Sequence, residues 1–161
     1  MKRREILRLS LTAAAVVGLL QKQALAHHGW SSFDQDRPIY LEGRVSKVTW
    51  QNPHAELELD LPDGLLLPVD LAHRKLPPQS APVDGKALLA KAVLPTRTDK
   101  RWEIELAPLT RLQAWKLPEI KPGSNVSVLG FTFTGEKAEA VLRAEYLFLD
   151  GTTYAFRSSP A

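Results

Sequence analysis

The chain contains no cysteine, and its one methionine is Met1. The absence of cysteine excludes disulfides, cysteine-built zinc sites and iron–sulfur clusters. Because the rest of the chain also lacks thioether sulfur, Cu(I) sites built on methionine are excluded as well. The stability of the fold must therefore come from core packing, and any metal site must use nitrogen and oxygen ligands.

A long hydrophobic run is also missing. The apolar stretch at residues 9–20 is well short of the roughly 20 residues that a membrane-spanning helix needs. Lys2, Arg3 and Arg4 precede this stretch, and Ala24-Leu25-Ala26 follows it. This order is typical of a secretory signal with cleavage between Ala26 and His27. We therefore expect residues 1–26 to be a cleaved export signal, residues 27–161 to form a single domain, and no membrane span to remain.

Within this signal, residues 3–8 (Arg-Arg-Glu-Ile-Leu-Arg) resemble a twin-arginine export motif. The alternative is a Sec signal in which the two arginines only supply the positive charge that precedes the apolar run. The two routes differ in whether the protein crosses the membrane folded. Both predict a periplasmic protein of a Gram-negative bacterium.

Positive charge is scarce once the signal is removed. Residues 1–26 hold five of the 21 lysines and arginines and one of the 18 acidic residues, which leaves 16 against 17 and a net charge of −1. A nucleic-acid-binding protein needs a basic surface. We therefore expect neither nucleic acid nor anionic lipid as a partner.

The remaining pattern is that of a mainly β protein. Strands are predicted at residues 41–50, 55–61, 102–106, 124–134 and 140–149, with a return strand at 153–156. Pro108 and Pro118 bracket one short helix between the third and fourth strands. Residues 62–100 hold six of the twelve prolines and form a long insertion after the second strand. This order predicts a small OB-like five-stranded barrel, closed with the help of a bulge near Ser46-Lys47 and a bend at Gly130.

Several motifs resemble an uncharacterised family of small exported bacterial proteins, the domain of unknown function 6152. They are His27-His28, Phe33-Asp34, Leu41-Glu42-Gly43-Arg44-Val45, Trp50-Gln51-Asn52-Pro53-His54, the stretch 102–106 and Lys121-Pro122-Gly123. The resemblance implies an exported protein with this fold, and it implies no reaction.

Three histidines are candidate metal ligands. If cleavage exposes His27, its α-amino group and imidazole can chelate a metal together, with His54 as a further ligand and His28 as a rival. Nitrogen ligands without sulfur favour Cu(II), followed by Zn(II). The alternative is that the histidines are ordinary structural or surface residues. Asp34 and Asp36 are candidates for orienting the ligands.

Trp30 and Trp50 are candidate ligand-binding residues. Trp102 and Trp115 occur in step with the apolar residues of the predicted third strand and helix, so we expect them to face the core. The outer carboxylates of the second and third strands (Glu56, Glu58, Asp60, Glu103 and Glu105) are expected to be solvated. The alternative is that such rows hold a cation or supply a general acid. The chain shows no nucleophile paired with a base, so no catalytic residues are predicted. The sequence thus predicts a non-catalytic binding or accessory protein for a small ligand or envelope partner. The alternatives are a copper-binding protein and an oligosaccharide- or partner-binding barrel.

Overall fold

The computed structural model of the protein describes residues 29–161. The chain divides into two units, residues 1–32 and residues 33–161. The described part of the first unit holds the short 3-10 helix η2 (Trp30–Ser32). His27 and His28 lie outside the described residues, as does the whole expected signal at residues 1–26.

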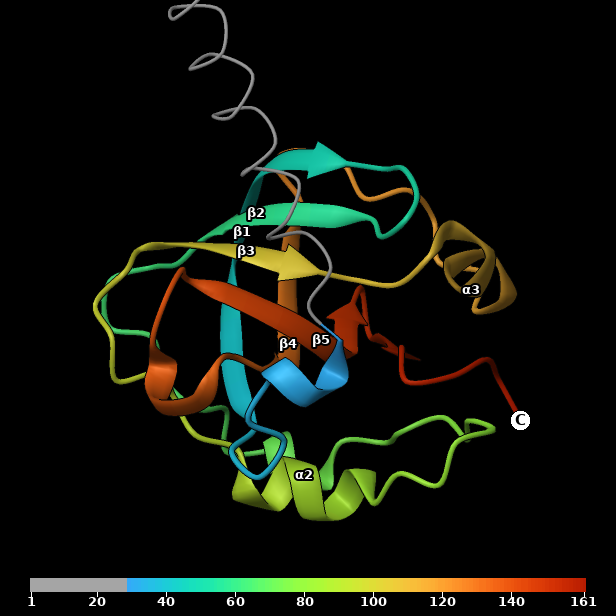
Figure 1. The fold of residues 1–161 in the computed structure, drawn as a ribbon, viewed down its shortest axis with the longest axis horizontal. Helices are drawn as coiled ribbons and strands as arrows, with labels where there is room; N and C mark the ends of the chain where they lie inside the picture. Colours follow the sequence, from blue (N-terminus) through green and yellow to red (C-terminus); the bar gives the residue numbers. More distant parts are fainter. Residues whose placement is uncertain (1–28) are drawn as a thin grey trace, which may run out of the picture. The chain divides into compact units, whose positions relative to one another are not determined.

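The second unit is built on a closed β-barrel (Figure 1). Its strands are β1 (Ile39–Thr49), β2 (Glu56–Asp60), β3 (Arg101–Glu105), β4 (Asn125–Phe131), β5 (Val141–Leu149) and β6 (Thr152–Ala155). The sheet order is β3-β2-β1-β4-β5-β6, and a parallel pairing of β3 with β5 closes the first five strands into a ring. All the other strand pairs are antiparallel. This is the predicted OB-like barrel, with β6 added to β5 as a hairpin.

Irregular pairing bends the strands as a small barrel requires. The register of β1 on β2 shifts between Val45 and Lys47, which confirms the expected bulge. A second shift lies between Leu129 and Gly130, where β4 meets β5. The β5–β6 turn places Asp150 and Gly151 at positive φ, as a tight hairpin turn requires.

Alternating side chains fill the barrel interior. Fully buried members include Leu41, Leu57, Leu59, Trp102, Ile104, Val128, Leu142 and Leu147. The prediction that Trp102 belongs to the core is therefore confirmed. Burial of these aliphatic and aromatic side chains supplies the main stabilisation in a chain without disulfides.

The long insertion after β2 folds onto the outside of the barrel. It contains the 3-10 helix η3 (Leu71–His73) and the helix α2 (Gly85–Lys91), whose N-terminus is capped by Asp84. Leu71, Leu89 and Ala92 of the insertion pack against an outer apolar surface of the barrel that includes Tyr40, Leu129 and Tyr146. The insertion thus forms a second core instead of a loose loop.

The predicted short helix between β3 and β4 is α3 (Leu109–Ala114), and Pro108 stands at its N-cap. Leu112 faces the core, whereas Trp115 follows the helix and packs partly buried against the second core. Another 3-10 helix, η4 (Thr134–Glu136), lies between β4 and β5, so β4 ends at Phe131, three residues before the predicted end of the fourth strand. Within residues 29–161, no helix is long and apolar enough to cross a membrane.

Candidate functional site

The β1–β2 turn carries two of the predicted site residues, Trp50 and His54. Trp50 is half-buried and packs against the barrel core. His54 is also half-buried and directly precedes Ala55, whose backbone is hydrogen-bonded to Leu106 and Ala107. Because Ala55 points into the core, the alternation of an extended chain places His54 and Glu56 on the outer face. The third predicted binding residue, Trp30, lies in η2 of the first unit and is half-buried.

Carboxylates cover the outer face of β2 and β3. The strand register places Glu56 opposite Glu105 and Glu58 opposite Glu103. We refer to these four residues, Glu56, Glu58, Glu103 and Glu105, as the acidic face. Like charges directly opposite each other on antiparallel strands destabilise a sheet. This arrangement of like charges therefore lowers the stability of the sheet.

Glu105 is not solvated, which corrects the prediction for this residue. Its side chain and that of Arg143 on β5 are each only 7 % exposed. Nε and Nη2 of Arg143 donate to one carboxylate oxygen of Glu105, at 2.9 Å and 2.6 Å. The cause is barrel closure, because the parallel β3–β5 pairing sets Glu105 opposite Arg143. The sequence contains no local signal for this pair, since Arg143 only alternates with the buried Leu142 and Ala144.

Aromatic rings lie against this ion pair. Phe33 and Phe133 stack with their ring centroids 5.0 Å apart, and they form an isolated antiparallel bridge. The guanidinium of Arg143 lies 4.9 Å from the centroid of the Phe33 ring. These contacts explain how a charged pair is tolerated at low exposure, because a guanidinium is stabilised over an aromatic face.

Two carboxylates of the acidic face have no ion pair among the described residues. Glu58 and its neighbour Asp60 are neutralised by Lys47 and Arg101, whereas Glu56 and Glu103 have no such partner. Burial, followed by the charge of Glu105, raises the pKa of Glu56. Burial, followed by the charges of Glu56 and Glu105, raises the pKa of Glu103. This end of the face therefore favours binding of a proton or another cation.

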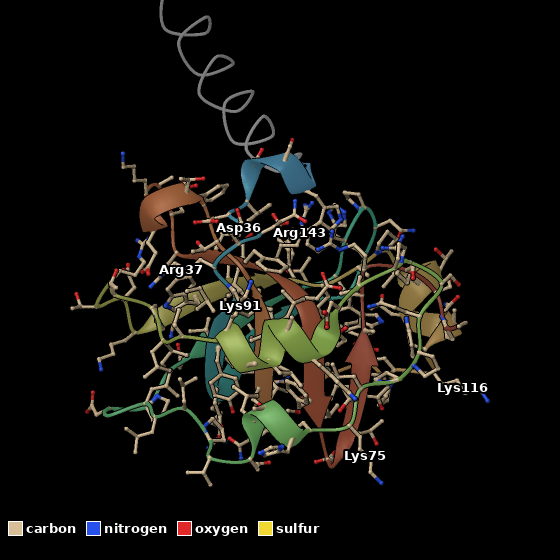
Figure 2. All side chains as sticks on the ribbon, turned by 90° about the horizontal axis from the view of Figure 1, so that it is seen from below. Asp36, Arg37, Lys75, Lys91, Lys116 and Arg143 are labelled. Atoms are coloured by element: carbon tan, nitrogen blue, oxygen red, sulfur yellow. The ribbon has the colours of Figure 1, made fainter. Side chains whose placement is uncertain are left out.

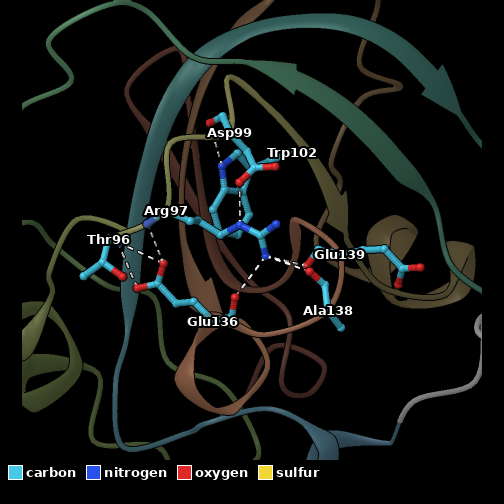
Figure 3. A network of polar contacts seen from close by, with 7 residues as sticks. All are labelled: Thr96, Arg97, Asp99, Trp102, Glu136, Ala138 and Glu139. Carbon is cyan, nitrogen blue, oxygen red and sulfur yellow. Dashed lines mark hydrogen bonds and ion pairs between the residues drawn. The ribbon is translucent and has the colours of Figure 1, made fainter.

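The loop between β4 and β5 is fastened to the end of the insertion (Figure 3). The Glu136 carboxylate accepts hydrogen bonds from the backbone N–H groups of Thr96 and Arg97, at 2.9 Å and 3.0 Å. The Arg97 guanidinium donates in return to the carbonyl oxygens of Glu136, Ala138 and Glu139, at 3.0–3.1 Å. The Arg37 side chain forms an ion pair with Glu136. This network fixes a loop that in OB folds borders the ligand-binding face.

The described residues do not form a metal centre by themselves. Within residues 29–161, His, Cys, Asp and Glu side chains nowhere form a group of three or more that could hold a metal ion. A site that includes His54 would therefore need ligands from outside this range, such as His27 or His28. Asp34, a candidate for orienting those ligands, accepts a hydrogen bond from the backbone N–H of Asp36, the other candidate.

Comparison with known proteins gives a family but no activity. No curated protein and no solved structure is significantly similar to the chain. The sequence profile of DUF6152, a family of unknown function, matches residues 15–64, a stretch that includes β1 and β2. This match confirms that the chain resembles the uncharacterised DUF6152 family.

Proposed function

We propose that the protein is an exported, periplasmic, non-catalytic binding protein that holds a cationic ligand on its acidic face. The observation that carries this proposal is that Glu56 and Glu103, on the outer face of β2 and β3, form no ion pair with any residue of 29–161. This is the face with which OB barrels bind their ligands.

The balance of charge favours a cation over other ligands. Glu56 and Glu103 lie diagonally across the two strands, at a spacing of about 7–8 Å that long side chains can bridge. A positively charged group between them would relieve their mutual repulsion and that of Glu105. A nucleic acid would be repelled by the same carboxylates.

Spermidine is a suitable probe, because it is a small polycation. We expect saturable binding by isothermal titration calorimetry, with chemical shift changes in β2 and β3. The double variant Glu56→Gln/Glu103→Gln should bind at least about 10-fold more weakly. The matched control, Asp63→Asn/Glu119→Gln, removes the same charge from sites outside the acidic face. Equal weakening in both double variants, or no saturable binding, would refute the proposal.

Copper binding is the second candidate function, and the position of His54 favours it. His54 precedes β2 by one residue and lies on the same outer face as Glu56. A mature chain that begins at His27 would add an amine and an imidazole, a set of nitrogen ligands that suits Cu(II). Because metal binding requires deprotonated nitrogens, the affinity should fall at acidic pH.

The copper hypothesis is tested by titrating the secreted protein with Cu(II). We expect tight one-to-one binding that weakens when one residue is added before His27, and weakens again in His54→Ala. The tetragonal nitrogen signature in electron paramagnetic resonance should change in the same variants. Equal binding by the extended form would exclude chelation by the chain terminus, whatever the result with spermidine.

A further inference from the structure

A polar pocket of about 510 Å³ lies between the insertion and the β5–β6 hairpin, away from the acidic face. Its volume is within the range of known small-molecule sites. Its lining includes Asp70, Arg74 and Lys75 from the insertion, Ser127 and Phe148 from the barrel, and Asp150, Thr152 and Thr153 from the hairpin. Figure 2 shows Lys75 and Arg143, the ion-pair partner of Glu105 in the acidic face, on opposite sides of the barrel. The pocket is therefore independent of the proposed cation site.

Arg74 is held rigidly in this pocket. Its backbone follows η3 directly and is bonded to the Leu71 carbonyl. Its guanidinium lies 4.7 Å from the centroid of the Phe148 ring and 5.9 Å from that of Tyr40. Nη1 also donates to the Ser127 hydroxyl at 3.4 Å. An arginine stacked in this way loses little further freedom when it binds a ligand.

The guanidinium keeps donors for a ligand. Its described hydrogen bonds use Nε, which donates to Asp70 at 3.2 Å, and one N–H of Nη1. The second N–H of Nη1 and both N–H groups of Nη2 therefore lack an acceptor among residues 29–161. The Asp70 side chain is 64 % exposed, and an ion pair that exposed adds little. Lys75 adds a second positive charge, which balances the lining carboxylates of Asp70 and Asp150, and it has no ion pair within the same range.

We propose that this pocket binds a small organic molecule through a carboxylate group, with Arg74 as the anchor. A carboxylate can accept two parallel N–H bonds from the planar guanidinium, which a point-like cation cannot offer. Lys75 supplies long-range attraction, and the hydroxyls of Thr152 and Thr153 are available to further polar groups of the ligand. Phe148 keeps one side of the guanidinium away from water.

A purely structural role for Arg74 is the competing explanation, since the same stack fastens the insertion to the barrel. Ligand binding separates the two explanations, because a structural arginine gives no saturable response to a carboxylate. The full chain, labelled with nitrogen-15, is titrated with succinate at constant ionic strength. We expect saturable shifts of the Arg74 Nε–H signal and of the Gly151, Thr152 and Thr153 amides.

Three variants make the test decisive. Arg74→Gln should weaken succinate binding at least about 10-fold. Arg74→Lys keeps the charge but loses the pair of parallel N–H donors, and it should also weaken binding. The control Arg44→Gln changes an exposed arginine outside the pocket, and it should bind normally.

Amide spectra of the Arg74 variants establish that the fold persists. No saturable shift, or equal binding by folded Arg74→Gln, overturns the proposal. Binding of inorganic phosphate without succinate overturns the carboxylate assignment.

Discussion

Glu105 and Arg143 form the most buried ion pair that the described residues contain, and their burial sets what each change would cost. Removing the charge of one partner leaves the other charge with little access to water. Such an uncompensated buried charge costs about 3–5 kcal/mol, whereas replacing both partners by apolar groups is often neutral. The stability of the fold therefore depends on keeping both residues or replacing both.

Glu105→Gln should lower the free energy of unfolding by about 3–5 kcal/mol, because the buried Arg143 guanidinium loses the carboxylate to which it donates at 2.6 Å. Urea denaturation at neutral pH measures this change. The double variant Glu105→Gln/Arg143→Met should recover much of the loss. Lys47→Gln breaks an exposed pair and should cost less than about 1 kcal/mol. A loss for Glu105→Gln as small as this control would contradict a buried pair.

Glu56 and Glu103 should make stability depend on pH. Because their pKa values are raised in the folded state, the folded protein binds more protons than the unfolded chain between the ordinary and the raised values. Their contribution to stability therefore decreases as pH rises through this window. Glu56→Gln and Glu103→Gln should each stabilise by roughly 0.2–1 kcal/mol at about pH 7, an effect lost at about pH 4. Urea denaturation at both pH values checks this, and destabilisation at neutral pH would be contrary to it.

At the scale of the strands, two glycines permit the close backbone approach that closes the barrel. A Cβ on Gly43 of β1 would lie 2.2 Å from the Asp60 carbonyl oxygen of β2. A Cβ on Gly130 of β4 would lie 2.2 Å from the Arg143 carbonyl oxygen of β5. Both neighbours are backbone atoms, which cannot move aside without separating the strands. Glycine is thus required at both bends by contact between strands.

Gly130→Ala should destabilise the protein by about 1–3 kcal/mol, because the added methyl group overpacks the β4–β5 contact. Gly151→Asn is the matched control. No atom lies near its Cβ position, and asparagine tolerates the positive φ of 77° at this turn. We expect the control to stay within about 0.5 kcal/mol of the parent. Similar thermal unfolding of the two variants would argue against the close approach.

The insertion is held at its C-terminal end by Glu136. Burial would raise the pKa of this carboxyl, but hydrogen bonds from the Thr96 and Arg97 backbones and the Arg37 side chain outweigh it and lower the pKa. The stabilisation that Glu136 provides is therefore present near neutral pH and lost as pH falls through its lowered value. The loop between β4 and β5 and the insertion should loosen together under acid conditions.

Glu136→Gln should speed amide hydrogen exchange at Thr96 and Arg97, because a neutral amide accepts these bonds more weakly. Exchange in the barrel interior, for example at Leu57, should change little. Asp63→Asn is a control that removes an exposed charge elsewhere. Uniform acceleration across the barrel would mean that Glu136 supports the whole fold, not this junction.

At the scale of the whole molecule, the basic character of the chain resides in its first 26 residues. With those removed, the net charge becomes −1. We predict that protein isolated from the periplasm has the mass of residues 27–161. Arg3→Lys/Arg4→Lys keeps the charge of the signal, and it should block export only if the route recognises the arginine pair. A different starting residue would remove the terminal chelate from consideration.

The strand pattern made much of the barrel predictable. Alternation in β2 and β3 identified the inner leucines and Trp102, and the phase change in β1 located its bulge. Helix α2 in the insertion was not predicted in detail, because its packing against Tyr40 and Tyr146 is decided by contacts distant in sequence. The Arg74 pocket was missed for the same reason.

The sequence by itself determined the class of fold, the excluded sulfur-ligand chemistries and the outward phase of most of the strand carboxylates. All of these depend on composition or on a period of two residues along one strand. Only the tertiary structure decided which outward residues meet. Barrel closure places Arg143 beside Glu105, because the parallel β3–β5 register joins segments nearly 40 residues apart. Within the part of the chain that the structure describes, Glu56 and Glu103 receive no such partner.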